Sequence, residues 1–379
     1  MKKIILFSTF YFMVVIYLFP QNAVFFTVEN GVLKRYSGTE KDVIIPEDLR
    51  VIEIGDRAFA NKSLTSIIIP NSVKKIGTSA FENNRTLKNI VIPSSIETIG
   101  TKAFYYCSGL SDVTISNGII NIEDNAFEQC GIINLNIPKS IASIGKEVFL
   151  YNRNLLQIIV DKDNENYFND QGGVLYSKKD NQLIYYPFAK KDKTYTIQQN
   201  IESIADSAFL GNKNLVEIIM PNSIKIIGEK AFMNSNITNI TFSKDLQILL
   251  HSAFFGCDKI INLTLPDSVE TIERSCFSGC ENLVNIYLPK NLRTISITLF
   301  KDCKKLETIN LPIGLEKIEY QAFYNCKSLK ILTIPSTVQS IGTQFVMNCD
   351  KLEKINMSRN TKLEFNAMAG YQDRVVYID

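Results

Sequence analysis

The chain has 379 residues, of which 45% are apolar and 21% are charged, a balance that indicates a folded protein and excludes a disordered one. Its 41 basic and 39 acidic residues give a formal net charge of +2, so no excess of positive charge favours nucleic acid or anionic lipid as a partner. The single histidine, His251, excludes a metal site built from several histidines and leaves one candidate for imidazole catalysis.

The first 22 residues predict a secretory signal peptide. Lys2 and Lys3 precede an apolar run of 16 residues, Ile4–Phe19, which Pro20 ends. This run is shorter than the roughly 20 residues that a membrane-spanning helix needs. We therefore expect cleavage and export to the cell surface or the medium, with the periplasm as an alternative destination and an uncleaved anchor as the alternative reading. After cleavage no segment of membrane-spanning length remains.

A unit of about 23 residues recurs through the rest of the chain. Its full copies begin at Leu64, Leu87, Leu110, Ile132, Leu155, Leu215, Ile237, Ile260, Leu283, Leu306, Leu329 and Leu352. The step of 60 residues from Leu155 to Leu215 equals one period plus an insertion of 37 residues. A fixed period in this range predicts a solenoid in which each coil packs only on its neighbours.

The pattern inside the unit predicts a mostly β leucine-rich repeat fold. Positions 1–6 form a short parallel strand, with positions 4 and 6 facing the core and positions 3 and 5 facing outward. Position 7 is most often proline, which ends the strand because it lacks an N–H group. Aliphatic residues at positions 10 and 13 predict a second short extended segment. The Ala-Phe pair at positions 17 and 18 belongs to a 3₁₀ or helical turn that contributes a file of phenylalanines to the core.

These observations divide the chain into six segments. They are a signal peptide (1–22), an N-terminal hairpin lead-in with a first partial repeat (23–63), a first repeat array (64–160), a β-hairpin insertion with a restart of the repeat (161–214), a second array (215–357) and a C-terminal cap (358–379). Within the insertion, Val174–Tyr176 and Leu183–Tyr186 are expected to pair as a hairpin. Because the period resumes, one continuous solenoid is favoured over two separate domains.

The repeat closely resembles a known family. Stretches such as NSVKKIGTSAF, SSIETIGTKAF and NSIKIIGEKAF are similar to the BspA-like class of bacterial leucine-rich repeats, and the likeness covers roughly residues 30–370. The resemblance implies exported or surface proteins, some of them adhesins for host matrix or plasma proteins. It supplies no catalytic motif, so we expect no enzymatic activity, and it implies no cofactor.

The eight cysteines allow two interpretations. Seven of them, residues 107, 130, 257, 280, 303, 326 and 349, occupy position 21 of the repeat, and Cys276 occupies the alanine position. We expect a file of buried thiols that behave as small apolar side chains. Disulfides between adjacent coils are the alternative in an exported protein. Cysteines at this spacing lie in a line along the stack, whereas zinc needs four ligands in a tetrahedron. No metal site is therefore expected.

Other polar or aromatic residues could form a site, but each also has a structural explanation. His251 and Ser252 lie in a predicted turn, and a catalytic pair would need an orienting group and an oxyanion site as well. The acidic piece Asp161–Glu165 lacks the ligand spacing of a calcium loop and is read as a solvated loop. Tyr185, Tyr186 and Phe188 form either a contact loop or the packed side of the insertion hairpin.

The outward residues at positions 3 and 5 are the candidate binding residues. The residues predicted to bind a partner are Asn239, Thr241, Asn262, Thr264, Asn285, Tyr287, Thr308 and Asn310. Solenoids bind partners on such extended surfaces, so a concave sheet face that holds a protein or glycan, as in an adhesin, is the leading hypothesis. The alternatives are a periplasmic or envelope scaffold, and polar side chains that serve only solubility.

Overall fold

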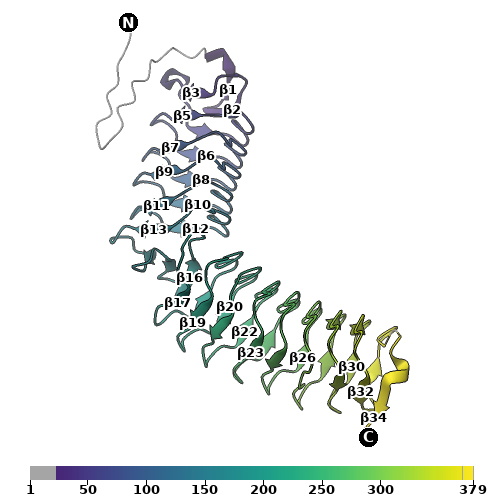
Figure 1. The fold of residues 1–379 in the computed structure, drawn as a ribbon. Coiled ribbons are helices and arrows are strands. Elements are labelled where there is room, and N and C mark those ends of the chain that lie inside the picture. Colours follow the sequence, from purple (N-terminus) through teal and green to yellow (C-terminus); the bar gives the residue numbers. More distant parts are fainter. Residues whose placement is uncertain (1–22, 369, 379) are drawn as a thin grey trace.

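The computed structural model describes residues 23–368 and 370–378, so the predicted signal peptide lies outside the described residues. Figure 1 shows a solenoid of stacked coils that bends once, near the middle of the chain. The described helices are three 3₁₀ turns, η1 (Ala23–Phe25), η2 (Glu47–Leu49) and η3 (Gln372–Arg374). The prediction of a mostly β leucine-rich repeat solenoid is confirmed.

Most coils contribute one long strand at positions 3–6 of the repeat. In β7, Asn89 and Val91 are exposed while Ile90 and Ile92 are buried, which is the predicted alternation. The long strands are β3 (Asp42–Ile44), β5 (Ser66–Ile68), β7 (Asn89–Ile92), β9 (Asp112–Ile115), β11 (Asn134–Ile137), β13 (Gln157–Val160), β17 (Thr194–Thr196), β19 (Glu217–Ile219), β21 (Asn239–Thr241), β23 (Asn262–Thr264), β25 (Asn285–Tyr287), β29 (Ile331–Thr333), β32 (Lys354–Met357) and β34 (Val375–Tyr377).

A short strand at positions 12 and 13 crosses the coil on another side, where the second extended segment was predicted. The short strands are β4 (Glu53–Ile54), β6 (Lys75–Ile76), β8 (Thr98–Ile99), β10 (Asn121–Ile122), β12 (Ser143–Ile144), β18 (Ser203–Ile204), β20 (Ile226–Ile227), β22 (Ile248–Leu249), β24 (Thr271–Ile272), β26 (Thr294–Ile295), β27 (Lys317–Ile318), β30 (Ser340–Ile341) and β33 (Lys362–Leu363). Each pairs in parallel with the same positions of its neighbour, as Thr98 does with Lys75.

The turn at positions 14–20 contains two left-handed residues in most coils, a feature that the sequence did not predict. Position 16 is left-handed in Arg57, Lys102 and Glu147, with φ between 54° and 56°. The N–H of Lys102 donates to the Asp124 carbonyl of the next coil at 2.9 Å. Because the same bond recurs from coil to coil, stacking compensates for a backbone conformation that residues with a Cβ rarely adopt. In two coils near the C-terminus, the turn segments also form short parallel strands that pair with each other, β28 (Phe323–Tyr324) and β31 (Val346–Met347).

The phenylalanines at position 18 form the predicted core files. In the first file, the ring centroids of Phe59, Phe81, Phe104 and Phe127 follow one another at 5.3, 5.0 and 5.2 Å. A second file runs from Phe209 to Phe323 with stacked rings 4.8–6.0 Å apart. These rings are fully buried or nearly so, and each packs on the coils before and after it.

The position 21 cysteines are free and buried, but they are more than small apolar side chains. The Cys303 thiol donates to the carbonyl of Phe277 in the previous coil at 3.2 Å, and the other position 21 thiols repeat this bond. Asn84, at the same position, donates to the carbonyls of Phe59 and Phe81 at 2.8 Å. Asn152 donates in the same way to Phe127 and Phe149, so a buried donor explains why cysteine and asparagine both occur at this position.

This environment should make the thiols unreactive in the folded protein. Burial raises the pKa of Cys107 and Cys257 to about 12 and that of Cys349 to about 11, so little thiolate forms at neutral pH. We expect iodoacetamide to leave the native protein unmodified and to label all eight cysteines after unfolding without reductant, as counted by mass spectrometry. Labelling of the native protein, or an unfolded protein that needs reductant before it reacts, would contradict the buried free thiols.

A hairpin opens each half of the solenoid. β1 (Phe26–Glu29) pairs with β2 (Val32–Tyr36), and β2 starts a parallel sheet that ends at β12. β14 (Tyr167–Asn169), β15 (Leu175–Ser177) and β16 (Gln182–Tyr185) form an antiparallel sheet, and β16 starts the next parallel series. The hairpin β15–β16 agrees with the predicted pairing, whereas β14 was not predicted.

The second hairpin lies between two separate hydrophobic cores. Leu175 and Tyr185 belong to the core of the first array, whereas Tyr176 and Leu183 belong to that of the second. Tyr185 and Tyr186 are buried, so hairpin packing accounts for them and not a contact loop. Since both faces of the hairpin are covered, the solenoid continues through the insertion.

The bend follows from the position of this insertion. On one side of the solenoid the turns of the flanking coils touch directly, with Lys146 Nζ 3.1 Å from Asp206 Oδ2 and the Ser207 hydroxyl donating to Glu147 at 2.8 Å. On the long-strand side, the insertion separates β13 from β17. Figure 1 shows the turns on the inner side of the bend and the long strands on its outer side.

Buried tyrosines at the bend should make the fold sensitive to alkaline pH. Tyr176 and Tyr195 hydrogen-bond through their hydroxyls, and Tyr195 donates to Asp170 Oδ2 at 2.6 Å. Burial raises the pKa of Tyr176 to about 12 and that of Tyr195 well above the ordinary value of 10.0. The native state therefore keeps protons that the unfolded chain releases as the pH rises through 10.0, and the free energy of unfolding should fall from that pH upward.

Urea unfolding at a series of pH values would measure this decline. A Tyr195→Phe variant removes one of the retained protons, so its stability should depend less steeply on alkaline pH than that of the parent. An equal slope in both proteins would assign the dependence to other groups.

Candidate functional site

The predicted binding residues lie on the long-strand face, by which we mean the outward positions 3 and 5 of the long strands. All eight are exposed: Asn239, Thr241, Asn262, Thr264, Asn285, Tyr287, Thr308 and Asn310. The expectation that this face is concave is wrong for the molecule as a whole, since Figure 1 places the long strands on the outer side of the bend. The physical reason is the insertion, which separates the two arrays on this side while their turns stay in contact on the other.

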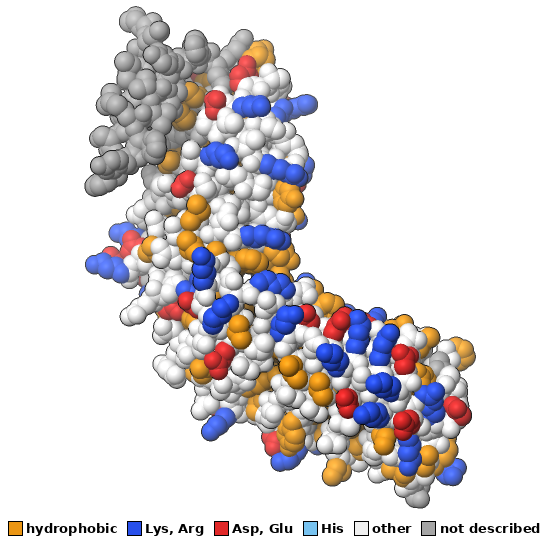
Figure 2. All heavy atoms as spheres, in the orientation of Figure 1, with side chains coloured by type: hydrophobic (Ala, Val, Ile, Leu, Met, Phe, Trp, Pro, Cys, Tyr) orange, Lys and Arg blue, Asp and Glu red, His pale blue; other side chains and the backbone are white. Residues whose placement is uncertain are grey.

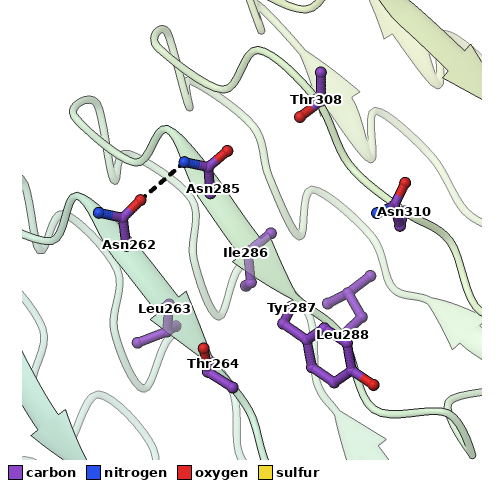
Figure 3. A pocket seen from close by; sticks show the side chains of 9 residues that line it. All are labelled: Asn262, Leu263, Thr264, Asn285, Ile286, Tyr287, Leu288, Thr308 and Asn310. Atoms are coloured by element: carbon purple, nitrogen blue, oxygen red, sulfur yellow. Dashed lines mark hydrogen bonds between the residues drawn. The ribbon is translucent and has the colours of Figure 1, made fainter.

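Six of the eight residues surround one shallow hollow of about 240 Å³. Figure 3 shows them on neighbouring coils: Asn262 and Thr264 from β23, Asn285 and Tyr287 from β25, and Thr308 and Asn310 from the next coil. Asn239 and Thr241 lie on β21, the preceding strand, and do not line the hollow. Leu263, Ile286 and Leu288 form its floor, which sequence reasoning assigned only to the core.

The hollow lies at a gap in the strand ladder. The repeat predicts a long strand at residues 308–310, but the structure describes no strand there, so that prediction is wrong for this coil. At the end of the preceding strand pair, β23 and β25, the Leu265 N–H donates to the Tyr287 carbonyl at 3.1 Å. Among the described residues, the corresponding bond from Leu288 to Asn310 is missing. Similar breaks separate β5 from β7, β9 from β11 and β21 from β23, so the break alone does not distinguish this copy. What distinguishes it is Tyr287, the one aromatic residue at position 5.

The side chains around the hollow are polar but uncharged. The Asn285 side-chain amide donates to Asn262 Oδ1 at 2.9 Å, the bond drawn in Figure 3. Among the described residues, the side chains of Thr264, Tyr287, Thr308 and Asn310 make no hydrogen bond to the protein. Amides and hydroxyls both donate and accept hydrogen bonds, so this arrangement suits a neutral polar ligand.

The wider surface gives no strong field of one sign. Figure 2 shows Lys and Arg side chains interleaved with Asp and Glu over the second array. Many pair between adjacent coils, as Lys225 does with Glu202 at 2.8 Å and Lys304 with Glu281 at 2.6 Å. Exposed pairs of this kind contribute little stability, but they neutralise one another at short range.

The other polar candidates are parts of turns. The His251 ring Nδ1 lies 3.1 Å from the Arg274 carbonyl and 3.3 Å from the Ser252 hydroxyl, and Ser252 is one of the left-handed turn residues. In the acidic loop, the buried Asn164 side chain donates to the Pro138 carbonyl at 2.9 Å. Within residues 23–368 and 370–378, no group of His, Cys, Asp and Glu side chains could hold a metal ion. The same residues include no helix with the length and hydropathy to cross a membrane.

Solved structures share this architecture. The pneumococcal vaccine antigen PcpA has a TM-score of 0.65 and 24% identity over 85% of this chain and 78% of its own. A leucine rich cell surface protein from Faecalibacterium prausnitzii has a TM-score of 0.53 and 25% identity over 88% of this chain and 92% of its own. A leucine-rich repeat protein from Bacteroides ovatus has a TM-score of 0.59 and 22% identity over 93% and 97%.

No match was found among curated proteins, but the sequence matches a family model over most of its length. The model describes the BspA type leucine rich repeat region in six copies, and it matches residues 35–156, 185–306 and 248–372. These spans include nearly all of both arrays and the candidate hollow, and the strand and turn positions within them follow one pattern. The chain therefore belongs to the BspA-type leucine-rich repeat family.

Proposed function

We propose that this protein is exported and acts without catalysis, as an adhesin that binds a protein or glycan partner through its long-strand face. The observation that carries the proposal is the uncharged hollow, where six outward residues from three coils converge around Tyr287. Tyrosine is enriched among residues that dominate binding energy, and polar side chains without protein partners can bond to a ligand. The family and the cell surface protein from Faecalibacterium prausnitzii support a location at the bacterial surface.

The partner would be a macromolecule of the host or of a neighbouring cell, such as a matrix or plasma protein. Repeat surfaces bind over several coils at once, and here positions 3 and 5 present Asn and Thr on successive strands. A balanced formal charge of +2 does not favour nucleic acid or anionic lipid.

Binding of the mature protein to immobilised matrix and plasma proteins tests the proposal. The double variant Asn285→Lys and Tyr287→Lys should abolish binding, because it places bulky charges at the hollow. The matched control is Asn134→Lys with Asn136→Lys, at positions 3 and 5 of β11 in the first array. Binding that survives the first change contradicts the assignment of binding to the hollow. Equal loss in both variants would show that the long-strand face binds without a special role for the hollow.

Location is tested separately by protease treatment of intact cells. An adhesin must be cleaved from outside, so a protected protein would contradict the proposal. That result would favour a scaffold of the periplasm or envelope.

A further inference from the structure

We infer that the hollow at β25 binds a neutral oligosaccharide, a sugar chain without carboxylate or sulfate groups. This inference rests on the proposed function and specifies the ligand class of the same face. It is carried by three features of the hollow: its charge, its hydrogen-bonding groups and its aromatic side chain.

Charge argues against an ionic ligand. None of the nine lining residues carries a charge at neutral pH. Two pairs of charged residues flank these strands, Lys290 with Asp267 at 2.9 Å and Glu307 with Lys330 at 3.0 Å. A sialylated or sulfated chain, or a strongly charged peptide, would find no unpaired opposite charge among the lining residues and would lose hydration without compensation.

The hydrogen-bonding groups suit sugar hydroxyls. Thr264 and Thr308 each present a hydroxyl, and Asn310 presents an amide with donors and an acceptor. The Asn262–Asn285 bond uses one donor and one acceptor and leaves the other groups of both amides available. A sugar hydroxyl also donates and accepts, so neighbouring hydroxyls of one ring can bond to an amide on both sides.

Tyr287 supplies the apolar part of the site. Its side chain is 47% exposed, although it lies on a face otherwise made mostly of small polar residues. An aromatic ring offers a flat apolar surface with a polar hydroxyl at one end. A pyranose ring has C–H groups on one face and hydroxyls around its edge, so it can stack on Tyr287 while the edge reaches Asn310 and Thr308.

A peptide added as an extra strand fits the hollow less well. Such binding needs a continuous free strand edge. The edge of β25 is three residues long, and the segment 306–311 of the next coil follows it in the stack. The hollow is therefore a short pit and not a long free edge, which favours a ring-shaped ligand.

The test is binding of the full-length mature chain to an array of neutral, sialylated and sulfated oligosaccharides, followed by calorimetric titration of the best neutral ligand. We expect neutral glycans to bind with an affinity that does not change between low and high salt. Tyr287→Ala should weaken binding about tenfold or more, while Tyr287→Phe should retain most of it. Val91→Ala, at the same repeat position in β7, is the matched control and should bind as the parent does.

The outcomes separate this inference from the function on which it rests. Binding only to acidic glycans, binding only to peptides, no binding on the array, or neutral binding that Tyr287→Ala leaves unchanged would each overturn the inference. If a protein partner still binds through the long-strand face in those cases, the proposed function stands and only the ligand class is wrong. Circular dichroism of each variant confirms that the solenoid is intact.

Discussion

Replacing Phe277 with alanine is expected to lower the free energy of unfolding by about 3–5 kcal/mol. The side chain is fully buried, and its ring stacks between Phe254 at 5.8 Å and Phe300 at 6.0 Å. Truncation removes apolar contacts on both sides and leaves a cavity that rigidly hydrogen-bonded coils cannot close. Because each coil is stabilised only by its neighbours, the loss affects three coils at once.

Urea unfolding followed by circular dichroism measures this effect. Phe277 belongs to the core of the second array, so the transition of that core should shift most. Phe365→Ala is the matched control, since this phenylalanine is 89% exposed and its loss should change stability by less than about 0.5 kcal/mol. Similar effects of the two substitutions would show that the file of rings does not dominate the stability of the stack.

The coil architecture was predictable because the chain repeats itself. Each position stacks on the same position of the next coil. The residue types found at that position in the twelve copies therefore indicate whether it is buried or exposed. The alternation in β7 and the ring at position 18 follow directly from the residue types that recur there. The pairing of β15 with β16 was predictable from two apolar runs around a polar turn.

Features that depend on contacts between coils were not predictable. Arg57, Lys102 and Glu147 are not residues that favour a left-handed conformation. The N–H groups of Arg57 and Lys102 donate to carbonyls of the next coil, and these bonds stabilise their backbone geometry. The role of the position 21 cysteines was missed for the same reason, since the acceptor of each thiol belongs to the previous coil.

The candidate site was predictable only as a set of outward residues. Positions 3 and 5 of adjacent coils must lie side by side, so Asn262 and Asn285 were expected to be neighbours. The hollow was not predictable, because it depends on how residues of three coils pack together and the sequence around Asn310 follows the repeat. The repeat pattern predicts which side chains face outward. Which of these side chains lie around one hollow depends on how neighbouring coils pack, and the pattern does not contain that information.

The second large effect is expected from Gly118→Ala, which should destabilise the first array by about 3 kcal/mol or more. Gly118 has φ of +135°, a conformation that costs a residue with a Cβ of order 1–3 kcal/mol. A Cβ at this position would also overlap the Ser94 carbonyl oxygen and lie 3.0 Å from the Ser94 carbonyl carbon. Since that neighbour is backbone, the overlap can be relieved only by moving a coil.

The coil cannot move freely, because Gly118 is held from its other side. Its N–H donates to the Ser140 hydroxyl at 2.9 Å, and that hydroxyl donates to the Ile119 carbonyl at 2.7 Å. Gly211→Ala is the matched control: Gly211 has φ of +69°, but the nearest atom to its Cβ would be Phe188 Cε2 at 3.4 Å. It should therefore cost only the roughly 1–2 kcal/mol of the left-handed conformation. Equal costs in urea unfolding would mean that backbone conformation alone requires Gly118, whereas a larger cost at Gly118 shows that close stacking on Ser94 requires it as well.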